Sequence, residues 1–221
     1  MITTKKISLA INALSCLIIL NSYAAEKTIK KLDDLQQLYA QLKKENKTII
    51  TFIGYSVAEY ENNQEMLDIV DNVLKQFDSS SLVVAAGFDD IGIGQVYKQA
   101  KKHNIPTIGL APIKFLNSAK FTPSTYADQM YYIEKKLDEN DSLSAVSQSR
   151  IALSDFFIVI GGGPVAAEEL KAAFIKDKSK VTFYAADMNH KKAIDFAKSQ
   201  NQAVPISFEG SAALVWTDLH K

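Results

Sequence analysis

A glycine-rich turn between a strand pattern and a helix pattern contains the residues best suited to chemistry. The run from Phe156 to Ile160 is apolar, which is typical of a buried parallel strand. Gly161, Gly162 and Gly163 follow it, and Pro164 then begins an amphipathic helical pattern. Glycine permits positive φ and a close backbone approach to a ligand, and proline is preorganised for the first helical position. Because a helix N-terminus presents free N–H groups and a positive dipole end, this turn predicts a phosphate or nucleotide site.

Glycines also follow two earlier predicted strands. Gly54-Tyr55-Ser56 comes after the first, and Gly87 to Gly94 comes after the second. Ligands of open α/β sheets bind at the carboxyl ends of the strands, so the three glycine-bearing ends predict one shared cleft, with ordinary turns as the alternative. The predicted ligand-binding residues are Gly54, Tyr55, Ser56, Gly87, Asp89, Asp90, Gly92, Gly94, Gly161, Gly162, Gly163 and Glu168.

The polar residues in these turns have two interpretations each. Tyr55 and Ser56 are suited to stacking on a base and hydrogen bonding to a phosphate. Asp89 and Asp90 are suited to ribose hydroxyls or a hydrated metal, or equally to Asx-type bonds with their own backbone. Three scattered histidines do not form a metal-binding pattern, so we expect no metal and no cofactor.

The elements that position these turns alternate between strand and helix patterns. Strands are expected at 48–53, 82–86, 105–110, 156–160, 181–184 and 204–208. Helices are expected at about 32–42, 66–77, 96–103, 126–140, 164–170, 191–199 and 211–219. This order predicts an α/β fold with a Rossmann-like open parallel sheet flanked by helices.

The N-terminus has the pattern of a secretory signal peptide. Lys5 and Lys6 precede an apolar stretch from Ile7 to Leu20, and small residues stand at positions 22 and 24. We therefore expect residues 1–24 to be a signal peptide cleaved after Ala24, residues 25–221 to form a single domain, and the protein to be periplasmic or secreted. The stretch is too short for a membrane anchor, so no stable membrane span is expected after cleavage.

Charge and cysteine content narrow the function further. The chain has 25 basic and 25 acidic side chains. Removal of Lys5 and Lys6 leaves 23 basic side chains, hence a net charge of −2 and no basic block, which argues against nucleic-acid binding. The only cysteine, Cys16, is lost with the leader, so the mature chain has no disulfide.

The order of elements resembles the SLOG superfamily and, within it, the Lonely-Guy-type nucleotide phosphoribohydrolases, often labelled lysine decarboxylase-like. The segments 82–97 and 107–112 are similar to the family in order and spacing. The family signature is Pro-Gly-Gly-x-Gly-Thr-x-x-Glu. In this chain Gly161 takes the proline position, Gly162 and Gly163 match the paired glycines, and Glu169 matches the glutamate. The resemblance covers roughly residues 47 to 207.

The signature is degenerate where the family binds phosphate. Val165 and Ala166 replace Gly-Thr and supply neither a slim backbone nor a hydroxyl. The family also places an arginine beside the glutamate, at a position that falls near Val146. Arg150, the only arginine, comes one helical turn later and is expected either to reach the cleft or to be exposed on its helix.

Three functions remain open. The first is an exported protein that binds a nucleotide, nucleoside or related sugar-containing small molecule. The second, implied by the resemblance, is an N-glycosidase in which Glu169 stabilises an oxocarbenium-like sugar or activates water; alternatively Glu168 and Glu169 only interact with the helix dipole. The third is a secreted interaction domain on a retired enzyme scaffold. Family members commonly form dimers, which implies a homodimer here.

Overall fold

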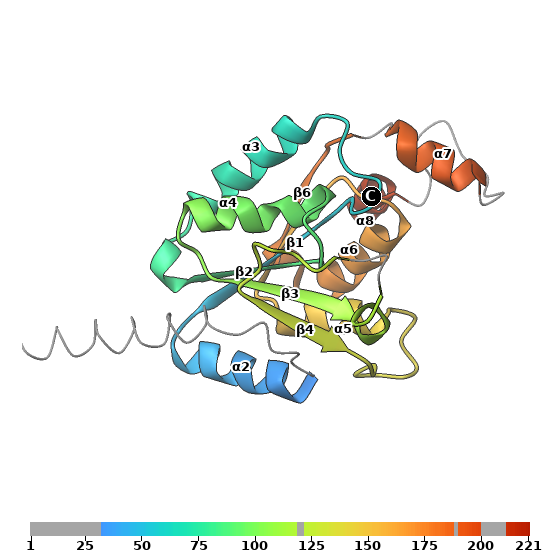
Figure 1. Ribbon diagram of the computed structural model, residues 1–221. Helices are drawn as coiled ribbons and strands as arrows, with labels where there is room; N and C mark the ends of the chain where they lie inside the picture. The colour runs from blue at the N-terminus through green and yellow to red at the C-terminus, as the bar shows by residue number, and fades with distance from the viewer. Residues whose placement is uncertain (1–31, 119–121, 188–189, 200–210) are drawn as a thin grey trace, which may run out of the picture.

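The core of the protein is a six-stranded parallel sheet with strand order β4-β3-β2-β1-β5-β6 (Figure 1). The computed structural model describes residues 32–118, 122–187, 190–199 and 211–221. The strands are β1 (Thr48–Gly54), β2 (Leu82–Ala86), β3 (Thr107–Pro112), β4 (Gln129–Ile133), β5 (Phe156–Ile160) and β6 (Val181–Tyr184). Every neighbouring pair of these strands is parallel.

Helices cover both faces of the sheet. In Figure 1, α3 (Asn63–Leu74) and α4 (Val96–Lys102) lie above the sheet and α2 (Leu32–Lys44) lies below it. The face of α2 is also covered by α5 (Ala145–Leu153), α6 (Pro164–Asp177) and α8 (Ala212–Leu219). α7 (Lys191–Ser199) follows β6 in the chain.

Burial on both faces explains the continuous apolar runs of the central strands. In β1, Ile50 and Phe52 pack under α3 and α4, whereas Ile49 and Ile53 pack on the opposite face. A strand of a parallel sheet covered on both faces therefore has few positions for polar side chains. The Rossmann-like α/β sheet expected from the sequence is confirmed.

The expected helix at 126–140 is wrong, because residues 129–133 form the edge strand β4 beside β3. Tyr131 and Ile133 belong to the apolar cluster under α2, while Tyr132 is buried as well. The backbone N–H and C=O groups of this segment therefore hydrogen bond to β3 rather than along a helix. The predicted strand at 204–208 and the predicted signal peptide lie outside the described residues.

The chain order creates a switch point between β1 and β5. From β1 the chain proceeds to β2, β3 and β4 on one side, then returns to β5 on the other side of β1. The turn after β1 leads to α3 on one face, and the turn after β5 leads to α6 on the other. Adjacent turns that diverge in this way leave a crevice at the carboxyl ends of the two strands.

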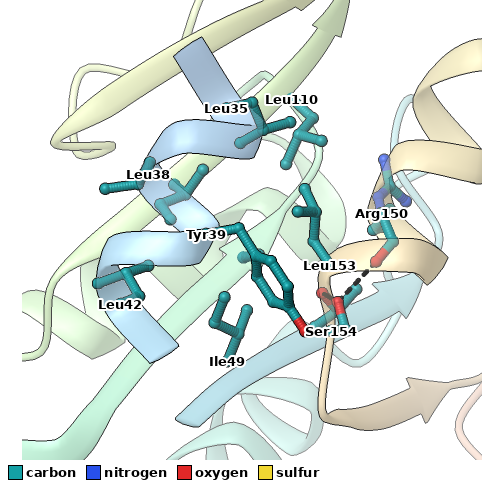
Figure 2. A pocket seen from close by; sticks show the side chains of 12 residues that line it. Leu35, Leu38, Tyr39, Leu42, Ile49, Leu110, Arg150, Leu153 and Ser154 are labelled. Carbon is teal, nitrogen blue, oxygen red and sulfur yellow. Dashed lines mark hydrogen bonds between the residues drawn. The ribbon is translucent and has the colours of Figure 1, made fainter. Parts of the chain in front are cut away.

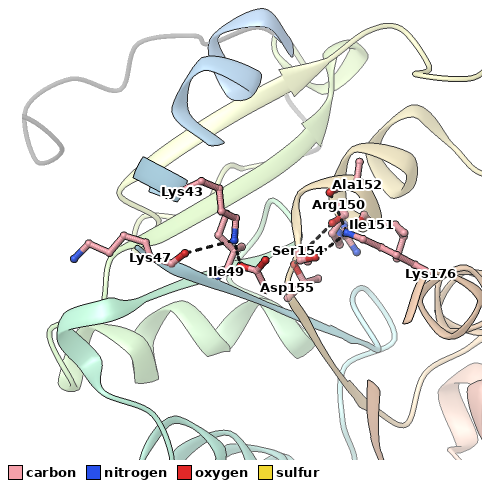
Figure 3. A network of polar contacts seen from close by, with 10 residues as sticks. Lys43, Lys47, Ile49, Arg150, Ile151, Ala152, Ser154, Asp155 and Lys176 are labelled. Atoms are coloured by element: carbon pink, nitrogen blue, oxygen red, sulfur yellow. Dashed lines mark hydrogen bonds and ion pairs between the residues drawn. The ribbon is translucent and has the colours of Figure 1, made fainter. Parts of the chain in front are cut away.

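A polar network at the opposite end of the sheet fixes α5 (Figure 3). Lys43 pairs with Asp155, whose carboxylate also accepts the Ile49 N–H at 2.8 Å. Lys176 on α6 donates to three carbonyls at the end of α5, those of Ile151, Ala152 and Ser154, at 2.7 to 3.0 Å. A lysine that caps the carbonyl end of a helix stabilises it through both hydrogen bonds and the helix dipole. The network thus holds α5 against α6.

Candidate ligand-binding cleft

A cleft of about 360 Å³ opens at the switch point between β1 and β5. One side is formed by the turn after β1 and the other by the start of α6. The cleft is lined by Gly54, Tyr55, Ser56, Val57, Ala58, Gly163, Pro164, Val165, Ala166 and Lys192. Its volume lies at the lower end of the range for small-molecule sites.

The walls of this cleft are mainly apolar. Val57 and Val165 stand on the two sides and are 68% and 69% exposed. Lys192 is the one charged side chain that the described part of the chain contributes to the lining, and its Nζ lies 3.5 Å from a carboxylate oxygen of Glu59. A ligand that covers both valines would remove apolar surface from water.

The glycine turn after β5 is shaped by close packing within the protein. Gly161 has φ +52° and Gly162 has φ +113°, conformations that other residues rarely adopt. A Cβ on Gly161 would collide with the Ala186 carbonyl, and one on Gly162 would collide with the Ala166 side chain. The glycines are therefore required by the turn itself, whether or not a ligand binds.

The backbone amides of this turn are used inside the protein. The Gly161 N–H donates to the Tyr184 carbonyl at 2.9 Å. The Tyr55 hydroxyl donates to the Asp187 carbonyl at 3.1 Å, and the neighbouring Gly162 backbone amide lowers the pKa of that hydroxyl, against the larger effect of burial. The expected phosphate cradle is thus occupied by a protein group at Gly161.

Tyr55 forms the floor of the cleft. Its side chain is only 4% exposed, with its ring 4.7 Å from that of His190 and 5.4 Å from that of Tyr60. Burial raises the pKa of Tyr55 to about 12. The ring is covered by these neighbours, so the expected stacking on a base does not fit this arrangement. Ser56 is exposed in the lining, as a ligand-binding role requires.

Glu169 lies in a buried ion pair with Arg150. The Arg150 Nη1 donates to both carboxylate oxygens, at 2.9 and 3.1 Å, and the Ser147 hydroxyl donates to Oε1 at 2.6 Å. The side chains of Arg150 and Glu169 are 13% and 2% exposed. The interpretation of Arg150 as an exposed helix residue is therefore wrong. Glu169 faces α5 and is absent from the cleft lining.

Arg150 also lines a small cavity between α2 and α5 (Figure 2). The cavity has a volume of about 10 Å³ and is otherwise lined mainly by apolar side chains, including Leu35, Leu110 and Leu153. The buried Arg150 Nε has no hydrogen-bond partner among the described residues. This volume is at the limit for one water molecule, so the cavity is no site for an organic ligand.

The turn after β2 packs against the turn after β1 and so supports one wall of the cleft. The Ile93 N–H donates to the Tyr55 carbonyl at 2.6 Å, and a Cβ on Gly92 would collide with that carbonyl. The turn residues predicted to bind ligand, Gly87, Asp89, Asp90, Gly92 and Gly94, do not line the cleft.

The two aspartates of this turn bond within the protein. Asp89 accepts the Ile91 N–H at 3.2 Å, an Asx-type bond, and burial raises the pKa of its carboxyl group. Asp90 accepts from the Ser124 hydroxyl and, at 3.0 Å, from the Thr125 N–H. Of the two interpretations, the geometry favours the Asx-type one for Asp89, and Asp90 joins two loops.

Glu168 lines a groove that is separate from the cleft. It pairs with Lys171 at 2.8 Å and lines an open groove of about 510 Å³ between the 137–143 segment, α5 and α6. No residue of a strand or of the three glycine-bearing turns lines that groove. The structure therefore separates Glu168 from the cleft, where it was predicted to bind a ligand. Glu169, its neighbour in the sequence, is absent from the cleft lining as well.

The described residues contain no group of three histidine, cysteine or carboxylate side chains arranged to hold a metal ion. The histidines have other contacts: the His103 ring lies 2.6 Å from the Asp71 carboxylate, and His220 Nδ1 lies 2.9 Å from the Trp216 carbonyl. Within the described ranges, no helix combines the length and apolar character needed to cross a bilayer.

Sequence reasoning missed Val57, Ala58 and Lys192 as cleft residues. Val57 and Ala58 directly follow the predicted Gly54-Tyr55-Ser56 turn, so a longer turn would have included them. Lys192 lies in the first turn of α7, more than 130 residues later in the chain, and no local pattern connects it with β1.

No protein-family model and no curated protein matches the sequence. Solved structures of similar fold include the molybdenum cofactor carrier protein of Chlamydomonas reinhardtii, with a TM-score of 0.46 and 23% identity over 79% of this chain and 99% of that one. Another is the X-ray structure of TM1055, with a TM-score of 0.45 and 14% identity over 69% of this chain and 99% of that one. At these scores the likeness carries no conclusion about function.

Proposed function

We propose that this chain is an exported small-molecule-binding protein whose ligand is a nucleotide, a nucleoside or a related sugar-containing molecule. The observation that carries the proposal is the cleft of about 360 Å³ at the switch point of the parallel sheet. Both of its walls are turns at the carboxyl ends of strands, where open α/β sheets bind ligands. The nucleotide-like class comes from the sequence resemblance.

Binding is favoured over hydrolysis by the position of Glu169. A catalytic carboxylate must reach the bond that it cleaves, or a water beside it. Both oxygens of Glu169 are instead bonded to Arg150, one of them also to Ser147, and the side chain is almost fully buried. This arrangement supports a role in holding α6 against α5, and so in fixing one wall of the cleft.

N-glycosidase activity is the second candidate, and the same ion pair is the observation in its favour. The resemblance implies an arginine beside the glutamate, and Arg150 contacts Glu169. The test is to incubate the mature protein with nucleosides and nucleoside monophosphates and to quantify the released base. Turnover that Glu169→Gln abolishes would establish this activity; turnover that survives the substitution would exclude the assigned role.

The binding proposal is tested with the mature chain, residues 25–221, by thermal shift and calorimetry against nucleosides and nucleotides. Val165→Trp should fill the cleft and weaken binding at least about tenfold. Ile175→Trp is the matched control, because Ile175 is an 84% exposed residue of the same helix that lines only the other groove. If no compound binds the wild-type protein, the ligand proposal fails and the interaction-domain alternative gains.

Export and assembly are tested separately. N-terminal sequencing of the protein from an extracytoplasmic fraction should give Ala25 as the first residue, and a protein retained with its Met1 inside the cell would contradict export. Light scattering coupled to size exclusion measures the mass of the mature chain and so tests the homodimer.

A further inference from the structure

We infer that the cleft binds an unphosphorylated nucleoside and discriminates against the corresponding nucleoside monophosphate. This inference rests on the proposed function, because it specifies the ligand class of the same cleft. Three features of the described residues carry it: the backbone of the glycine turn, the charged side chains around the cleft, and the side chains on its two walls.

The glycine turn has few amides to offer to a phosphate. A phosphate at a helix N-terminus is bound by several free backbone N–H groups. Here the Gly161 N–H is bonded to the Tyr184 carbonyl, and Pro164 has no N–H. Two of the four residues from 161 to 164 therefore have no free N–H to offer to a phosphate.

The charged side chains also oppose a phosphate. Arg150, the only arginine of the chain, is committed to Glu169, so no guanidinium remains for the bidentate contacts that phosphates favour. Among the described residues, Lys192 is the one cation in the cleft lining, and it is paired with Glu59. The carboxylates of Asp187 and Glu61 further act on Tyr55 at the cleft floor, where they help to raise its pKa. A phosphate dianion at the cleft would therefore meet one lysine whose charge is already partly neutralised by Glu59.

The walls suit the flat face of a base. Val57 and Val165 offer apolar surface from opposite sides, and Val165 stands where the signature that this chain resembles has a glycine. At the rim, Lys192 can donate and Glu59 can accept hydrogen bonds. A base edge or sugar hydroxyls offer both complementary groups, whereas a phosphate offers acceptors alone.

The test compares matched pairs by calorimetry on the mature protein. Adenosine, guanosine, cytidine and uridine are each titrated beside the corresponding 5′-monophosphate. We expect the bound nucleoside to have at least about tenfold higher affinity than its monophosphate. Glu59→Gln removes one carboxylate while retaining a hydrogen-bonding side chain, and should narrow that difference severalfold by raising the affinity for the monophosphate. Circular dichroism of Glu59→Gln checks that the fold is retained.

The outcomes separate this inference from the proposed function. A monophosphate that binds as tightly as its nucleoside, or more tightly, overturns the inference and leaves the proposed function standing. A nucleoside preference that Glu59→Gln does not change contradicts the electrostatic part of the argument. If no nucleoside and no monophosphate binds, the inference fails, and the proposed function stands only if another sugar-containing compound binds the cleft.

Discussion

Replacement of Arg150 by methionine should strongly destabilise the fold, because it leaves the Glu169 carboxylate buried without its cation. Glu169 is 2% exposed, and the bonds at 2.9 and 3.1 Å from Arg150 are its charged contacts among the described residues. Only the Ser147 hydroxyl, at 2.6 Å, would remain. Breaking a buried pair by removing one partner costs about 3–5 kcal/mol. For a domain of this size, that corresponds to a decrease in Tm of about 6–20 °C.

Urea unfolding followed by circular dichroism measures this loss, and the double variant Arg150→Met/Glu169→Leu is the matched control. Removing both charges eliminates the uncompensated carboxylate, so the double variant should recover most of the lost stability. A loss below about 1 kcal/mol for Arg150→Met would be the value of an exposed pair and would refute the reasoning. Glu169 would then be free to face a ligand, and the hydrolytic alternative would regain support.

Three further predictions concern the turns around the cleft. Gly162→Ala should cost about 1–3 kcal/mol in thermal unfolding, because φ is +113° and the added Cβ would meet the Ala166 side chain; an unchanged Tm would show that the turn can relax. Burial raises the pKa of Tyr55 from 10.0 to about 12, so the unfolding free energy should fall as pH rises from 10 to 12, and less steeply in Tyr55→Phe. Burial also raises the pKa of Asp89, whose ionised form is therefore disfavoured in the folded state. Asp89→Asn, which keeps an acceptor for the Ile91 N–H, should increase stability to urea at pH 7, with a smaller gain near pH 3.8. An equal gain over the wild-type protein at both pH values would contradict this reasoning.

Local sequence patterns identified most of the sheet because burial acts on each strand separately. The apolar run Phe156–Ile160 is buried on both faces, as its composition requires. The pattern failed at Gln129–Ile133, where a short run with polar neighbours fits either a helix or a strand. Pairing with β3 and contact with α2 decided that segment, and neither is local in the sequence.

At the candidate site, too, some features follow from the local sequence and others from tertiary contacts. The sequence by itself predicted the turn after β5, since Gly161 and Gly162 have positive φ and Pro164 begins α6. Only the tertiary structure decided how the groups in the turns after β1 and β5 are used. Strand order brings β1 beside β5, more than 100 residues later, and so places the Tyr55 ring against Gly161. The packing of α5 on α6 pairs Arg150 with Glu169. A hydrogen bond or ion pair depends on which groups meet in space, and residue types in one segment do not contain that information.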